Sequence, residues 1–177
     1  MRVLIILIFM LPSVISMSQK YSLEKSKVVF FSEAAIENIE ATNTKSASIF
    51  NVTTSEIVFS IPIAEFEFEK ALMKEHFNET YLESEKYPKA LFQGKLSGYN
   101  SQSSAVQSVN GIGKLTIHGV TREVEIPGSV ETIDGKLIAK SKFMIHLKDY
   151  KVKIPKLLWQ NIAEDVEVTV EFIYKPL

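Results

Sequence analysis

Residues 166–174 read VEVTVEFIY, and apolar and polar side chains alternate through this stretch. Successive side chains of a β-strand point to opposite faces, so the alternation predicts a strand with one buried face and one mostly wet face. The same period of two recurs along most of the chain, for example in Ile57, Phe59, Ile61 and Ile63. The repeated alternation predicts an all-β protein.

Two short motifs predict turns between further strands. IDGK at residues 133–136 contains Asp-Gly, a strong hairpin signal, and HGVTRE at residues 118–123 joins two other alternating segments. Near Ala64 the apolar stripe moves from odd to even positions, which predicts a bulge, corner or strand end. The chain therefore contains about eight antiparallel strands, which fits either an up-and-down barrel or a sandwich.

Glycines occupy part of one apolar stripe. In VNGIGKLTI at residues 109–117, Gly111 and Gly113 share a face with Leu115 and Ile117. Glycine on an inward face leaves room for a neighbouring backbone, a large side chain or a ligand. The pattern alone does not choose among the three.

One region has helical spacing. Between residues 69 and 80 the apolar side chains of Leu72, Met73 and Phe77 recur on one face of a helix, and Tyr81 follows. Pro88 then closes the segment, because proline favours an extended residue before it. We expect this helix to cap or flank the barrel.

Acidic side chains crowd the same segment, EHFNETYLESEKYP at residues 75–88. Four glutamates around His76 are the raw material of a metal or catalytic site, but His76 lies about 100° from Glu75 on a helix. The preferred interpretation is that the acids form the wet side of a lid, with Tyr81 and Tyr87 fixing the lid to the wall.

The N-terminus has the layout of an export signal. Residues 1–11 read MRVLIILIFML, and Pro12 and the small residues of SVISMS follow. This predicts a secretory signal peptide over residues 1–18, cleaved after Ser16 or Ser18. The apolar run is shorter than the roughly 20 residues of a transmembrane helix, so we expect no stable membrane anchor.

The mature domain, residues 19–177, is expected in the periplasm or outside the cell. The chain has no cysteine, so this domain must be stable through its own core rather than through disulfides. The formal net charge of the 177-residue chain is -1, which argues against nucleic acid as a partner, because phosphate binding requires a basic face.

Two longer motifs resemble a known family. MKEHFNETYLESEKYPKALFQG at residues 73–94, then GKLTIHGVTREVEIP at residues 113–127, then a closing strand, are similar to the YceI family of exported, lipocalin-like proteins. The resemblance covers essentially the whole mature chain. It implies an antiparallel eight-stranded barrel with an elongated apolar interior, and a non-enzymatic protein that binds a polyisoprenoid or another long-chain amphiphile without a cofactor.

The ligand-lining residues are expected on inward stripes and on the apolar face of the helix. An eight-stranded barrel is either filled by its own side chains or holds one small ligand. If it is open, the wall comprises the mid-strand residues Ile61, Ile63, Phe92, Leu115, Ile117, Phe143 and Ile145, and the lid residues Leu72, Met73 and Phe77.

An open apolar interior favours a long ligand. Burying one methylene contributes about 0.8 kcal/mol, whereas association costs roughly 4 to 15 kcal/mol. Five buried carbons barely offset that cost, but about fifteen exceed it without any polar contact. The expected role is therefore transport, storage or sequestration of a long chain.

Two other functions are carried as alternatives. His118 and His146 lie on the face opposite the apolar stripes, and two imidazoles can begin a metal site of a metal-dependent protein or enzyme. No G-x-S-x-G elbow is present to activate a serine. A filled barrel acting as an interaction module is the second alternative.

A basic run follows the longest apolar stripe. The lysines of KDYKVKIPK alternate with apolar residues, as on an exposed edge strand that carries charge against aggregation. The alternative is that they meet an anionic head group. The lysines concerned are Lys148, Lys151, Lys153 and Lys156.

Overall fold

The computed structural model describes residues 20–33, 38–154 and 163–177. The predicted signal peptide lies outside the described residues, as does Lys156 of the basic run. Among the residues described, none of the helices has the length and apolarity needed to cross a membrane.

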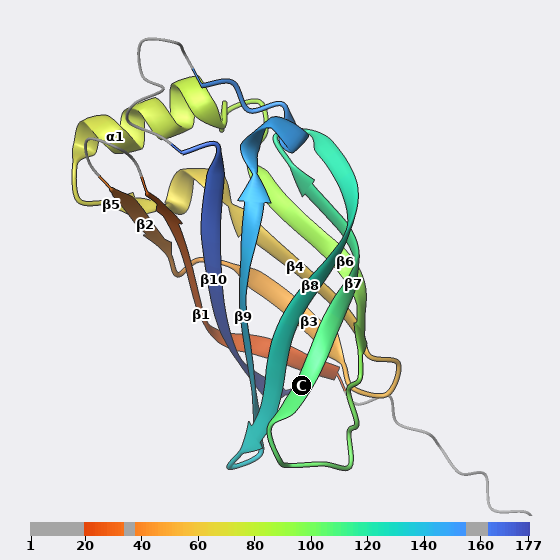
Figure 1. The fold of residues 1–177 in the computed structure, drawn as a ribbon. Helices are drawn as coiled ribbons and strands as arrows, with labels where there is room; N and C mark the ends of the chain where they lie inside the picture. The colour runs from red at the N-terminus through yellow and green to blue at the C-terminus, as the bar shows by residue number, and fades with distance from the viewer. Residues whose placement is uncertain (1–19, 34–37, 155–162) are drawn as a thin grey trace, which may run out of the picture.

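Strands dominate the described chain, as the alternating pattern predicts (Figure 1). The strands are β1 (Lys20–Ser32), β2 (Ile39–Asn43), β3 (Ala47–Asn51), β4 (Glu56–Pro62), β5 (Glu67–Phe68), β6 (Lys89–Ser97), β7 (Gln107–Ile117), β8 (Val120–Ile133), β9 (Lys136–His146) and β10 (Asp165–Pro176). The helical elements are η1 (Ile63–Glu65), α1 (Ala71–His76), η2 (Phe77–Tyr81) and η3 (Leu147–Tyr150).

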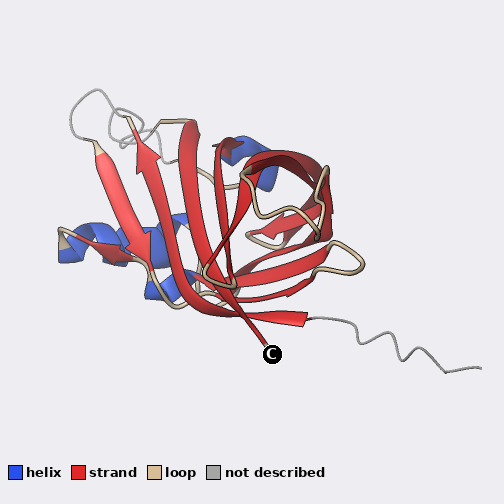
Figure 2. Ribbon diagram, turned by 90° about the horizontal axis from the view of Figure 1, so that it is seen from below, coloured by secondary structure: helices blue, strands red, loops and turns tan. Residues whose placement is uncertain are grey.

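Eight of these strands close into a barrel. The hydrogen-bonded order runs β10-β9-β8-β7-β6-β4-β3-β1, and β1 pairs back onto β10. All of the pairings are antiparallel. Viewed from below, the strands curve round in a ring (Figure 2). The predicted eight-stranded, lipocalin-like barrel is confirmed, and the sandwich is not what forms.

The remaining two strands branch off at one end of the barrel. The first residues of β1 pair with β3, whereas its last five residues pair with β2, which carries β5 on its other edge. Asn43, which is fully buried, holds the branch: its side-chain amide donates to the carbonyl of Pro62 at 2.8 Å, and its oxygen accepts from the N–H of Lys45 at 2.8 Å.

The predicted turns form where the sequence places them. Asp134 and Gly135 have φ of 50° and 75°, and His118 and Gly119 have φ of 50° and 72°. Two consecutive residues with positive φ define the type I′ hairpin, whose twist matches that of the strands. Near Ala64 the phase change is produced by the short η1 turn, which allows both Ile63 and Phe66 to be buried.

The helix predicted between residues 69 and 80 is confirmed as α1 and its continuation η2. Figure 1 shows this segment across one end of the barrel. Phe77 anchors it: its ring stacks on Phe30 with centroids 5.3 Å apart and meets the rings of Phe66 and Phe68 at 5.5 and 5.0 Å. We call α1 and η2 the lid, and this end of the barrel the lid end.

The opposite end, which holds the β8–β9 hairpin, is closed by packed side chains. Tyr174 has no exposed surface, and its hydroxyl is 2.7 Å from the hydroxyl of Ser48. Burial raises the pKa of the Tyr174 phenol, which therefore stays neutral. The ring of Phe50 lies beside it and meets the edge of Tyr99 at 5.0 Å between centroids. We call this the hairpin end.

The two inward glycines make room for different neighbours. A Cβ built on Gly113 would lie 2.3 Å from the carbonyl oxygen of Gln93 on β6. A Cβ built on Gly111 would lie 3.5 Å from the ring of Phe92. Strands β6 and β7 therefore approach closely at Gly113, and the phenyl ring of Phe92 lies beside Gly111 and Gly94.

Candidate functional site

An apolar cavity of about 130 Å³ lies inside the lid end of the barrel. Its wall comes from the inward stripes of β1, β4, β6, β7, β9 and β10, from β2, β5 and η1 beside them, and from the lid and η3, so segments from most of the described chain meet around it. The lining residues are Val28, Phe30, Ser32, Ile39, Phe59, Ile61, Ile63, Phe66, Phe68, Met73, Phe77, Tyr81, Leu82, Ala90, Leu115, Ile117, Phe143, Ile145, Leu147, Val152, Val166, Val168 and Val170.

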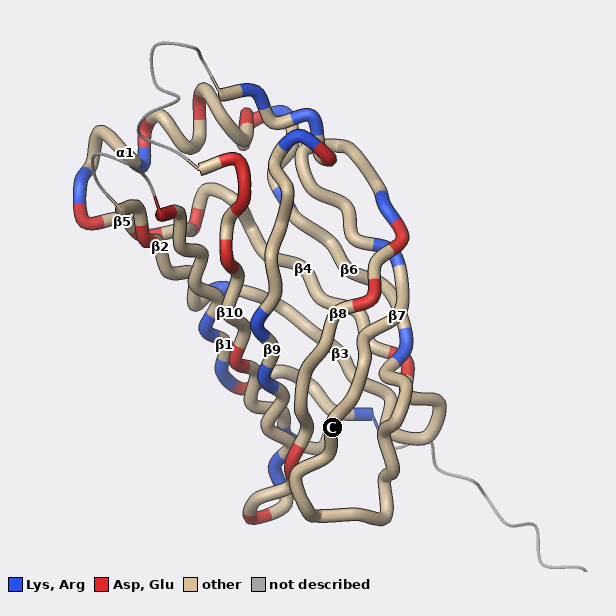
Figure 3. The backbone as a smooth tube through the Cα atoms, viewed as in Figure 1, with Lys and Arg blue, Asp and Glu red and all other residues tan. Residues whose placement is uncertain are grey.

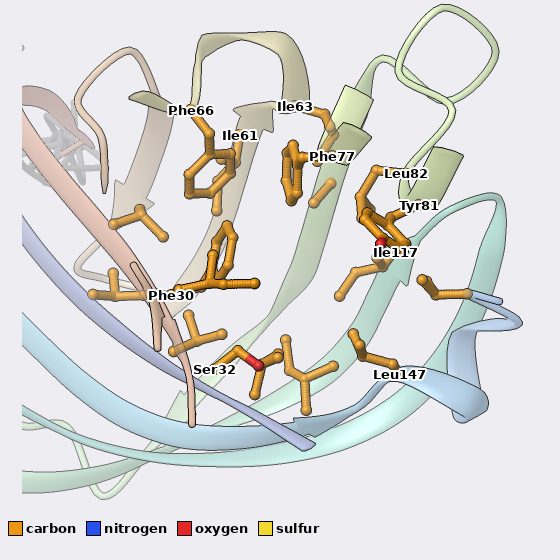
Figure 4. A pocket seen from close by; sticks show the side chains of 18 of the residues that line it. Phe30, Ser32, Ile61, Ile63, Phe66, Phe77, Tyr81, Leu82, Ile117 and Leu147 are labelled. Atoms are coloured by element: carbon orange, nitrogen blue, oxygen red, sulfur yellow. The ribbon is translucent and has the colours of Figure 1, made fainter. Parts of the chain in front are cut away.

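Figure 4 shows the rings of Phe30, Phe66 and Phe77 grouped on one side of this cavity, with Tyr81 and Leu82 on the other. Ser32 contributes a hydroxyl, but its oxygen already accepts a hydrogen bond from the N–H of Ala163 at 2.9 Å. The surface presented to the cavity is apolar throughout. Such a wall binds hydrocarbon through burial, because it offers a ligand no polar partner.

Most of the residues that the sequence predicts as ligand-lining reach this cavity. They come from six elements, β4, η1, α1, η2, β7 and β9, so both the barrel wall and the lid contribute. They are Ile61, Ile63, Met73, Phe77, Leu115, Ile117, Phe143 and Ile145.

Leu72 and Phe92 lie elsewhere. Leu72 is 60% exposed on the outer side of the lid, because adjacent residues of a helix point about 100° apart and Met73 takes the inward direction. Phe92 is buried on the inward stripe of β6 but lines a second cavity, of about 70 Å³, closer to the hairpin end.

An aromatic layer separates the two cavities. Phe59 lines both of them and stacks on Phe92, with ring centroids 5.0 Å apart and planes inclined by 15°. Phe172 meets the edge of Phe59 at 5.6 Å, and Phe143 and Val170 also border both cavities. The interior is thus open, but it is divided.

Several lining residues lie outside the set predicted from the sequence. Val166, Val168 and Val170 belong to the alternating stretch at residues 166–174, so period-two spacing was a sufficient signal for them. Phe30 and Leu82 carried no such signal, because their positions depend on the branch in β1 and on the exit of the lid.

The two histidines have separate carboxylate partners. Nε2 of His118 is 2.7 Å from Glu83, and its Nδ1 is 3.2 Å from the carbonyl oxygen of Tyr150. The side chain of His146 is hydrogen-bonded to the carboxylate of Asp165 on the neighbouring strand β10. Over residues 20–33, 38–154 and 163–177, no three His, Asp or Glu side chains are arranged to hold a metal ion.

The acidic residues of the lid and of the segment that follows it divide into two groups. Glu75, Glu79 and Glu85 are exposed, as expected for a solvent-facing surface, whereas Glu83 turns toward His118. The ring of Tyr87 meets the His118 ring at 4.5 Å between centroids. The β7–β8 turn therefore fastens the exit of the lid to the barrel.

The basic run does not form the predicted edge strand. Residues 147–150 form the short 3-10 turn η3, because Lys151 adopts a left-handed conformation with φ of 56° and bends the chain. Tyr150 and Val152 are buried under this turn, while Lys148, Lys151 and Lys153 are exposed. The turn positions Leu147 and Val152 in the cavity wall.

The size of the cavities sets the length of chain they can hold. A water-sized atom requires about 10–15 Å³ of such space, so 130 Å³ holds on the order of ten carbon atoms and 70 Å³ about five. A chain of fifteen carbons would have to displace the Phe59–Phe92 layer. These dimensions define the site as a lidded, apolar, internal cavity of a lipocalin-like barrel.

Comparison with known proteins agrees with this class. The sequence model of the YceI-like domain matches residues 20–174, and the chain therefore belongs to the YceI family. No curated protein sequence matches it.

Three solved structures illustrate the shared fold. A polyisoprenoid binding domain from Saccharophagus degradans, implicated in plant cell wall breakdown, has a TM-score of 0.76 and 16% identity, covering 89% of this chain and 98% of that one. BcnA from Burkholderia cenocepacia has a TM-score of 0.69 and 18% identity, covering 84% and 95%. A YceI protein from Campylobacter jejuni has a TM-score of 0.61 and 16% identity, covering 82% and 88%.

Proposed function

We propose that this protein is an exported carrier that holds the hydrocarbon chain of an isoprenoid or fatty amphiphile inside its barrel. The observation that carries the proposal is the apolar, lidded cavity at the lid end, whose wall offers burial and no polar chemistry. The polyisoprenoid binding domain that shares its fold supports the class of ligand. The N-terminal segment supports export, because it has the layout of a signal peptide.

The proposed role is sequestration or transport rather than catalysis. A wall without nucleophile, acid or base can bind a chain but provides no group to transform it. Selectivity then follows chain length, because each buried methylene adds about 0.8 kcal/mol, or roughly a fourfold change in Kd.

A chain-length series tests this proposal. Protein stripped of lipid by denaturation and refolding is titrated with primary alcohols of six to eighteen carbons, in competition with a fluorescent fatty probe. We expect the affinity to rise roughly fourfold per carbon up to about ten carbons and then to flatten at the Phe59–Phe92 layer. Affinity that does not depend on chain length, or no binding of any alcohol, would refute the carrier function.

A further inference from the structure

The wall of the barrel contains a gap in its hydrogen bonding. Strands β8 and β9 pair only from Gly128 with Ser141 down to Ile133 with Lys136. From Gly128 and Ser141 toward the lid end, the two strands no longer pair with each other. Residues 120–127 of β8 pair only with β7, and residues 142–146 of β9 pair only with β10. Figure 1 shows the two strands diverging toward the lid end. We call this divergence the seam.

Pro127 explains why the seam begins where it does. Ser141 on β9 donates its hydroxyl hydrogen to the carbonyl of Pro127 at 2.6 Å, so the backbone of Pro127 faces β9. Proline has no N–H, and the donor that would continue the ladder toward the lid end is therefore missing. Charged residues border the two separated strands (Figure 3), as expected for edges protected against pairing with other chains.

Exposure shows that the seam reaches the cavity. Phe143 and Ile145 lie on the inward stripe of β9 and line the lid-end cavity, yet both are only half-buried. Val166 and Val168, their register neighbours on the inward stripe of β10, are buried. The difference arises because, among the described residues, no strand pairs with residues 142–146 of β9 on the seam side.

One charged residue faces inward at this seam. Arg122 on β8 is paired with Leu115 on β7, and residues opposite each other in a ladder share a face. Leu115 lines the lid-end cavity, so Arg122 belongs to the inward stripe. At the paired positions of the described barrel strands, every other charged side chain belongs to the outward stripe.

The surroundings of Arg122 leave its guanidinium available to an anion. Its side chain is 49% exposed, and its nearest carboxylate oxygen, on Asp149 of η3, is 3.8 Å away, longer than a hydrogen bond. Burial raises the pKa of the Tyr150 phenol, and the positive charge of Arg122 acts in the opposite direction, so the two side chains are close enough to interact. A guanidinium presents five donors in a fork that fits phosphate and carboxylate groups.

We propose that Arg122 binds the anionic head group of the ligand, a phosphate or carboxylate, at the lid end of the seam while the chain occupies the cavity. This inference rests on the proposed carrier function and adds to it the class and position of the head group. It also gives the ligand a direction, with its polar end at the seam and its apolar end toward Phe59.

A matched pair of ligands tests the head-group site. Dodecyl phosphate and dodecanol have the same chain, so the ratio of their affinities reports the head group alone. We expect the native protein to bind the phosphate about tenfold more tightly than the alcohol at low salt, with the ratio falling as salt is added. Arg122→Gln should bring the ratio close to one without changing the affinity for dodecanol.

Two further variants control for nonspecific charge effects. Lys114→Gln removes the same charge from the exposed, outward face of β7 and should leave the ratio unchanged. Asp149→Asn removes the competing carboxylate and should raise the affinity for dodecyl phosphate severalfold. Inorganic phosphate should compete poorly with dodecyl phosphate, because it has no chain; equal competition would mean a phosphate site that does not belong to a lipid.

The outcomes separate the two proposals. If the native protein binds both dodecyl compounds and Arg122→Gln leaves their ratio unchanged, the head-group site is wrong and the carrier function stands. If the native protein binds neither compound, the carrier function fails and the head-group site fails with it.

Discussion

Replacing Ala90 by phenylalanine should weaken the binding of a twelve-carbon chain about 100-fold or more while the barrel stays folded. Ala90 lines the lid-end cavity from β6 and is buried opposite Ile61. A phenyl ring there would occupy several of the roughly ten carbon positions, and each excluded methylene costs the ligand about 0.8 kcal/mol. The Kd for dodecanol and the Tm of the variant should be measured together.

Because the new ring enters existing space, overpacking should be small and the Tm should change by only a few degrees. Ala47→Phe makes the same substitution on the exposed face of β3 and should bind dodecanol like the native protein. If a folded Ala90→Phe variant keeps native affinity, chains bind somewhere other than this cavity.

Replacing Phe59 by alanine should join the two cavities and lengthen the preferred ligand. Phe59 borders both spaces, and its stack with Phe92 forms the layer between them. Without this ring, a chain can continue into the 70 Å³ beyond it. In the alcohol series, the affinity should keep rising fourfold per carbon for about five carbons past the native plateau.

The same substitution should lower the free energy of unfolding by about 3 kcal/mol, the lower end of the range for phenylalanine, because Phe59 is only partly buried. Phe50→Ala removes an equally large ring from the hairpin end, away from both cavities, and controls for this loss. It should destabilise the barrel without moving the plateau. A plateau that stays in place in Phe59→Ala would show that the aromatic layer does not limit chain length.

Local patterns predicted the parts of the fold that depend on neighbours in sequence. Alternation at residues 166–174 and 57–63 gave the strands and their inward faces, and Asp134-Gly135 gave a hairpin because few residue pairs tolerate two positive φ angles. The helical spacing of Met73 and Phe77 gave the lid. Each of these features is specified by a few consecutive side chains.

Features that depend on distant contacts were not predicted. Leu72 and Met73 are both apolar, so the sequence pattern predicts both as lining residues, but Met73 takes the inward direction and Leu72 is exposed. The lysine run has the alternation of a strand, but the left-handed Lys151 converts it into a turn that buries Tyr150. The seam depends on Pro127 of β8 meeting Ser141 of β9 across the hairpin, a contact that the alternation within either strand does not predict.

The alternation of apolar residues also does not predict that the interior is divided into two cavities. The alternation identifies the inward positions. Whether the side chains at these positions fill the barrel depends on how their aromatic rings are oriented. Phe59 and Phe92 stack because Gly94 and Gly111 leave space for the Phe92 ring, which shortens the open part of the barrel. Period and composition identify a wall, whereas the volume behind it requires coordinates.

The most direct test of the account is to locate a bound chain by crystallography. Crystals of the barrel grown with 12-bromododecanoic acid would show the terminal bromine by anomalous scattering. The account predicts one strong bromine peak inside the lid-end cavity, close to the ring of Phe59, with the carboxylate toward Arg122. Bromine found only on the outer surface, with the cavity empty at saturating ligand, would contradict it.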